Sequence, residues 1–99
     1  MDQPRKKVDF DEHVGSRFAF RVDDDTTVEL ELVESEALPP GGPAAPRQDP
    51  FALLFSGPPE TPLIQRLYDV SHPEMGDLVL FIVPVMPDEK GPRYEAVFN

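Results

Sequence analysis

The sequence has 99 residues, which suffices for one domain, spanning 1–99, and is too short for two. It has no cysteine, which excludes a disulfide framework, a thiolate metal site and a cysteine nucleophile. Nineteen acidic and nine basic residues give a formal net charge of −10, a field that repels nucleic-acid phosphates and anionic lipid, so neither is an expected partner.

The N-terminus and the apolar runs bear on localisation. No apolar run follows the basic residues Arg5, Lys6 and Lys7, whereas a secretory signal needs one of about 7–15 residues. The longest apolar run covers residues 78–86, less than half of the roughly 20 residues of a membrane helix. We therefore expect a cytoplasmic protein as translated.

The first expected elements are a flexible arm over residues 1–8 and one short helical turn over residues 10–14. Asp9 suits the cap of this turn and Gly15 its end. No other segment favours a helix. The N-terminal region is therefore expected to contribute little regular structure.

Six segments carry apolar side chains at every second position, the period of a strand with one buried face. They cover residues 16–22, 26–36, 51–56, 65–71, 78–85 and 93–98. Asp23, Asp24 and Asp25 form a turn signal that joins the first two as a hairpin. Five prolines and two glycines make residues 39–50 a loop.

This pattern predicts an all-β fold, a small antiparallel six-stranded barrel or sandwich. The expected core is Phe18, Phe20, Leu30, Leu32, Phe55, Tyr68, Leu80, Ile82 and Phe98.

The fifth strand is apolar on both faces. Leu80 and its alternate neighbours belong to the core, whereas Val79, Phe81 and Val83 point the other way. A strand that is apolar on both faces is normally covered on both. Either residues 8–14 cover the second face, which would make the protein a monomer, or that face is an interaction surface for another chain. We prefer internal cover and hence a monomer.

His13 and His72 each stand near acidic residues, so either could help to bind a divalent metal. Their spacing fits no ligand template. We expect both to be structural, each imidazole capping a turn by bonding a backbone carbonyl. The three consecutive aspartates lack the alternation of a calcium loop, so a solvated turn is the better interpretation.

No catalytic motif stands out: the sequence has no nucleophile elbow, no phosphate-binding loop and no dinucleotide fingerprint. We therefore expect no enzyme, and neither a cofactor nor a bound metal. A small β domain can serve many functions, so the fold alone does not choose among them.

The chain also resembles a small bacterial family classed only as a domain of unknown function. The resemblance is carried by Phe10-x-x-His13-x-Gly15-x-x-Phe18, Pro50-Phe51-x-Leu53-x-Phe55-x-Gly57-Pro58, Gln65-x-x-Tyr68-x-x-x-His72-x-x-Met75-Gly76, Leu80-Phe81-x-Val83-Pro84-Val85 and Tyr94-Glu95-Ala96-Val97-Phe98-Asn99. It implies association with phage-tail-collar-type proteins and assigns no activity to any residue.

The expected function is a non-enzymatic interaction or structural accessory module, through the resemblance one of a phage-tail-like assembly, with a protein as its partner. The alternative is a small-ligand or metal-binding barrel that uses His13 or His72. The two differ in whether the histidines and several carboxylates converge in one pocket.

Overall fold

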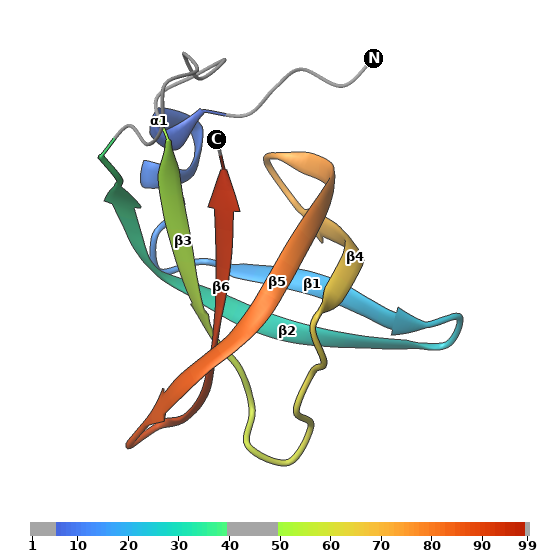
Figure 1. Cartoon of the computed structure of the whole chain (residues 1–99). Helices are drawn as coiled ribbons and strands as arrows, with labels where there is room; N and C mark the ends of the chain where they lie inside the picture. Colours follow the sequence, from blue (N-terminus) through green and yellow to red (C-terminus); the bar gives the residue numbers. More distant parts are fainter. Residues whose placement is uncertain (1–5, 40–49, 99) are drawn as a thin grey trace.

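The computed structural model describes residues 6–39 and 50–98. The elements in chain order are α1 (Lys7–Asp11), β1 (Arg17–Asp23), β2 (Thr26–Ala37), β3 (Phe51–Ser56), β4 (Arg66–His72), β5 (Gly76–Asp88) and β6 (Gly91–Phe98). The strands close into a barrel in the order β1-β2-β3-β6-β5-β4, and every neighbouring pair is antiparallel (Figure 1). The predicted all-β class and six strands are confirmed.

Strand bounds differ from the predicted ones mainly at β5, which extends beyond residues 78–85 in both directions. The pairing of β5 with β6 shifts register between Val85 and Asp88. Such a bulge accommodates Pro87, which has no N–H to give to a ladder. A two-residue turn then leads into β6 at Gly91.

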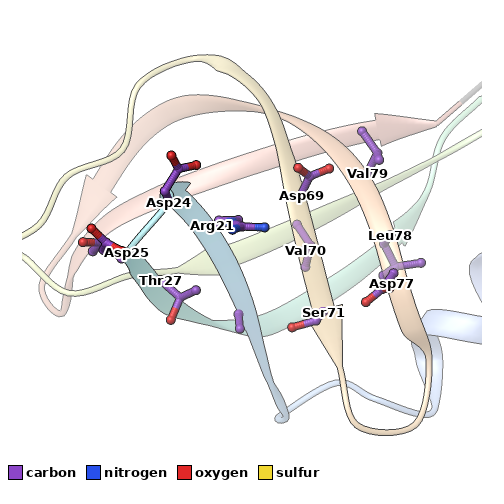
Figure 2. Close-up of a pocket in the computed structure, with 12 residues that line it drawn as sticks. Arg21, Asp24, Asp25, Thr27, Asp69, Val70, Ser71, Asp77, Leu78 and Val79 are labelled. Carbon is purple, nitrogen blue, oxygen red and sulfur yellow. The ribbon is translucent and has the colours of Figure 1, made fainter.

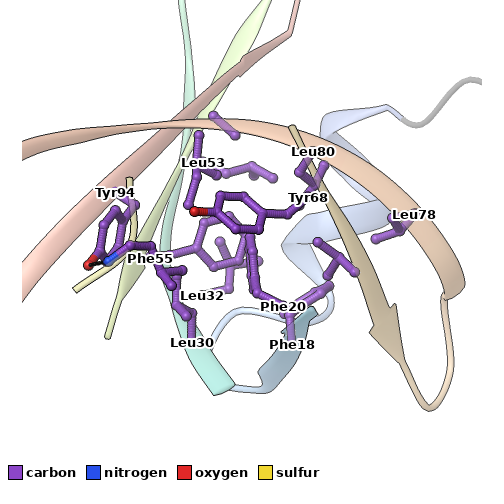
Figure 3. Packing of buried hydrophobic residues seen from close by; sticks show 14 of the residues in the cluster. Phe18, Phe20, Leu30, Leu32, Leu53, Phe55, Tyr68, Leu78, Leu80 and Tyr94 are labelled. Atoms are coloured by element: carbon purple, nitrogen blue, oxygen red, sulfur yellow. Dashed lines mark hydrogen bonds between the residues drawn. The ribbon is translucent and has the colours of Figure 1, made fainter. Parts of the chain in front are cut away.

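The interior is filled by the alternate side chains that the period of two predicts (Figure 3). Every predicted core residue is buried except Phe98, which is partly buried and packs against the cluster. Three aromatic rings the prediction omitted, Phe10, Phe51 and Tyr94, join the core. Tyrosine belongs in this core because its hydroxyl finds a polar partner: Tyr94 Oη accepts the Leu63 N–H at 2.8 Å.

Phe10 is the largest departure from the predicted core. It lies on α1 at the end of the barrel near the start of β3 and the end of β6 (Figure 1). Its ring is fully buried, 5.5 Å from that of Phe98 and 5.9 Å from that of Phe51 between centroids. The helix therefore closes one end of the barrel through a single aromatic side chain.

The helix also begins earlier than predicted, so Lys7 belongs to it and not to a flexible arm. Asp9 is its third residue and accepts the Lys6 N–H at 2.9 Å, where the prediction made it the cap. Gly15 has φ +97°, a conformation that favours glycine, and ends the turn as predicted. Residues 1–5 of the predicted arm and 40–49 of the predicted loop lie outside the described residues.

The predicted cover of the second face of β5 is wrong. Residues 8–14 do not lie over it, because α1 packs against β2 and sends Phe10 into the core. Phe81 is 46% exposed and Val79 is 60% exposed. A strand that is apolar on both faces therefore need not have both faces buried by its own chain.

The barrel closes weakly between β1 and β4. Their ladder holds only Ala19 opposite Ser71 and Phe20 opposite Val70. Figure 1 shows β4 meeting β1 near its middle, with the β1–β2 hairpin continuing beyond. Farther along, the Arg66 guanidinium from β4 donates to the Val22 carbonyl of β1 at 3.4 Å, so a side chain spans the seam where the ladder has ended.

Candidate functional site

An exposed apolar patch lies on the outer face of β4 and β5. Leu67 of β4 stands opposite Phe81 of β5 in the ladder, and Asp69 stands opposite Val79. Leu67 and Val79 are each 60% exposed. We call Leu67, Val79, Phe81 and the half-buried Val83 the outer patch.

The sequence predicted three members of this patch and missed the fourth. Val79, Phe81 and Val83 share one face of β5, as expected. Leu67 directly precedes the buried Tyr68. Because consecutive residues of a strand point to opposite faces, one of these two apolar side chains has to point outward, which was the available signal.

A groove adjoins the patch at the seam between β1 and β4. It consists of two hollows of about 520 and 480 Å³. Both are lined by Arg21, Asp24, Asp69 and Val79, so they lie next to each other. Figure 2 shows Asp24 on the β1–β2 hairpin side and Asp69 on β4, with Arg21 between them. We call the two hollows together the seam groove, which is lined by Arg21, Asp24, Asp25, Arg66, Leu67, Asp69, Asp77 and Val79.

The seam groove is strongly acidic. Its carboxylates outnumber its two guanidiniums, and Asp23 adds a further carboxylate to one hollow. The Asp23 carboxylate already has a hydrogen-bond partner, because it accepts the Asp25 N–H at 2.9 Å. This hydrogen bond lowers the pKa of the Asp23 carboxyl. The three aspartates of the hairpin thus form an exposed turn, in line with the interpretation favoured over a calcium loop.

Within residues 6–39 and 50–98, the other carboxylates of the groove have no such partner. Among the described residues, Asp24, Asp69 and Asp77 form no side-chain hydrogen bond or ion pair with one another or with Arg21. The groove therefore presents solvated charge beside the exposed apolar side chains of the outer patch.

The two histidines meet at another place, which the sequence could not show. The ring centroids of His13 and His72 are 4.5 Å apart, and His72 is only 6% exposed. The His13 Nδ1 lies 3.6 Å from a carboxylate oxygen of Glu74. This cluster ties the segment after α1 to the turn between β4 and β5.

Hydrogen bonds assign the tautomer of His72. Its Nδ1 faces the backbone N–H groups of Glu74 at 3.1 Å and Met75 at 3.2 Å, so Nδ1 accepts. The Ser16 hydroxyl donates to the His13 carbonyl at 2.7 Å. The oxygen of the same Ser16 hydroxyl lies 3.0 Å from His72 Nε2. Because the hydroxyl proton is already donated to the His13 carbonyl, Nε2 carries the ring proton and donates it to the hydroxyl oxygen.

This arrangement corrects the predicted role in one respect. His72 does cap a turn, but its ring accepts two backbone N–H groups, and it bonds directly to no carbonyl of the described residues. Burial lowers the pKa of His72, the neighbouring His13 lowers it further, and Glu74 opposes both. The imidazole is therefore held neutral.

The cluster is poorly suited to a metal. A zinc ligand needs a free imidazole lone pair, and the one lone pair of His72 accepts two backbone N–H groups. Within residues 6–39 and 50–98, no group of three or more histidine, aspartate or glutamate side chains is placed to hold a metal ion.

Comparison with known proteins places the chain in a family. The family model described as Domain of unknown function (DUF6916) matches residues 6–98, and the chain belongs to that family. No curated protein and no solved structure matches it. Across the described part of the chain, no helix has both the length and the apolar character needed to cross a membrane.

Proposed function

We propose that this domain is a non-enzymatic protein-interaction module whose binding surface is the outer patch with the adjoining seam groove. The observation that carries the proposal is the exposure of Leu67, Val79 and Phe81 side by side on paired strands. Single apolar side chains are common on protein surfaces, but an aromatic ring flanked by aliphatic neighbours and rimmed by charge is typical of an interface.

The chemistry of the groove favours binding over catalysis. The described residues that line it include no histidine. Ser71 lies in one hollow of the groove. Ser71 also lines a further hollow of about 660 Å³ with Ser16 and His72. His72 is nevertheless unavailable as its base, because Nδ1 accepts two backbone N–H groups and Nε2 faces the Ser16 hydroxyl. A hydroxyl without a base within hydrogen-bond reach is a weak nucleophile.

The partner class follows from the family resemblance, which implies phage-tail-collar-type proteins. We propose that the domain is an accessory component of a phage-tail-like assembly, and that a phage-tail-collar-type protein is the first partner to test. Alone, the domain should be a monomer, because two copies would bring their acidic grooves together.

Phe81→Ser should weaken partner binding about tenfold or more while leaving the fold intact, because the ring is a central anchor of the patch and half-exposed in the free domain. The measurement is the dissociation constant with a co-expressed phage-tail-collar-type protein, by calorimetry, with light scattering for stoichiometry. Val97→Ser is the matched control, since Val97 is 50% exposed on β6, outside the patch. Equal losses in both variants would contradict the proposed surface, and absence of a complex would contradict the proposed partner.

A further inference from the structure

We infer that the segment of the partner that enters the seam groove is extended and basic; this inference rests on the proposed function and specifies its ligand. The shape of the groove is the first argument. Beyond Phe20 and Val70, β1 and β4 no longer pair with each other, although β1 still pairs with β2 and β4 with β5. The smaller hollow is lined by the unpaired edges of both strands, and the larger one also extends over the paired residues Ala19, Val70 and Ser71.

Strand edges of this kind bind polypeptide by main-chain hydrogen bonding, with side-chain pockets adding selectivity. The only described side chain bridging these two edges by a hydrogen bond is Arg66, whose bond to the Val22 carbonyl is long at 3.4 Å. Arg66 also lies over the Tyr68 ring, 4.5 Å from its centroid, and can keep that contact if the bond to Val22 is exchanged for one to a ligand.

Charge is the second argument and selects the occupant. Asp24, Asp69 and Asp77 have no described partner, and lysine or arginine side chains would complement them. A second copy of this chain carries the same net charge of −10 and would be repelled. Nucleic acid is repelled for the same reason.

The apolar rim is the third argument. Leu67 and Val79 line the groove at the border of the outer patch. An extended segment presents alternate side chains to one face, so it can place an aliphatic residue against this rim and basic residues against the aspartates. The expected ligand is an extended segment that combines lysine or arginine with one or two aliphatic residues.

The probe is a short synthetic peptide of alternating lysine and threonine with a central valine, titrated into isotope-labelled domain and followed by amide chemical shifts. We expect shifts along residues 21–23 and 66–69 that saturate, and none with the same peptide carrying glutamate for lysine. Asp69→Asn with Asp77→Asn should weaken binding about tenfold. Glu34→Gln with Glu36→Gln removes the same charge from the exposed face of β2 and should leave binding unchanged.

Equal weakening by the two double variants would mean that the peptide senses only net charge, and would overturn the inference. So would absence of saturable binding, or shifts located elsewhere. Concentration-dependent dimerisation that is abolished by Phe81→Ser would identify a second copy as the occupant instead. If the collar-type protein binds through Phe81 while the aspartate variant has no effect on either ligand, the interaction function and the outer patch stand, and the seam groove as a site for a basic segment fails.

Discussion

Phe10→Ala is expected to lower the free energy of unfolding by about 3–5 kcal/mol, the usual cost of emptying a buried phenylalanine site. The Phe10 ring is fully buried among Phe18, Phe51 and Phe98. A helix of five residues cannot hold itself together, so its position depends on this ring. Loss of the ring should therefore also release the N-terminal segment.

Urea unfolding of the wild type and two variants measures this effect. Phe81→Ala removes the same atoms from a half-exposed site and should cost no more than about 1.5 kcal/mol. If instead Phe81→Ala matched or exceeded Phe10→Ala, the covered face predicted from the sequence would be correct and the barrel-end position of Phe10 wrong.

The second large effect concerns His72. His72→Ala should cost about 2–4 kcal/mol, because it removes the buried ring nitrogen that accepts the N–H groups of Glu74 and Met75 in a part-buried turn. His72→Asn offers an amide oxygen near the position of Nδ1 and should recover part of the loss. Urea midpoints of the two variants at pH 7.5 provide the comparison, and equal losses would contradict the capping role.

The same residue should make stability depend on pH. Its pKa is lowered in the folded state, mainly by burial, so the unfolded chain binds the proton more readily. The contribution of His72 is therefore complete above the ordinary value of 6.5 and is lost as the pH falls from there toward the folded pKa. Asp88, whose pKa is held down by its hydrogen bond to Arg93, titrates below this window.

Urea midpoints between pH 7.5 and 5 follow this loss. His72→Asn should abolish most of the decline, whereas His13→Gln should retain most of it, because burial and not His13 is the larger cause of the shift. A decline that survives in His72→Asn and vanishes in His13→Gln would assign the dependence to the other imidazole.

The fold could be predicted well because one signal, the period of two in the apolar residues, dominates the sequence. In a half-buried strand the period of two decides both the element and its buried face, and β5 shows this, with Leu78, Leu80 and Ile82 inside and Val79 and Phe81 outside. Strand bounds were less predictable, because bulges such as the one after Val85 depend on pairing.

Phe10, which was predicted to cover a face of β5, shows which information the apolar period of a sequence does not contain. An apolar side chain on a single helical turn can cover a sheet face or close a barrel end, and only the arrangement of β3 and β6 decides between them. For the same reason the groove could not be predicted: Asp24, Asp69 and Asp77 come from three separate segments that barrel closure brings together. The meeting of His13 with His72 is likewise a consequence of tertiary structure.

On the proposal made above, the outer patch and the seam groove together form the partner-binding surface. Hydrogen–deuterium exchange of the domain, free and in complex with a phage-tail-collar-type protein, tests it most directly. We expect slowed exchange in β4, in the first half of β5 and at the end of β1, with β2 and β3 unchanged where they pair. Slowed exchange confined to the β2–β3 ladder, with β4 and β5 unaffected, would contradict it.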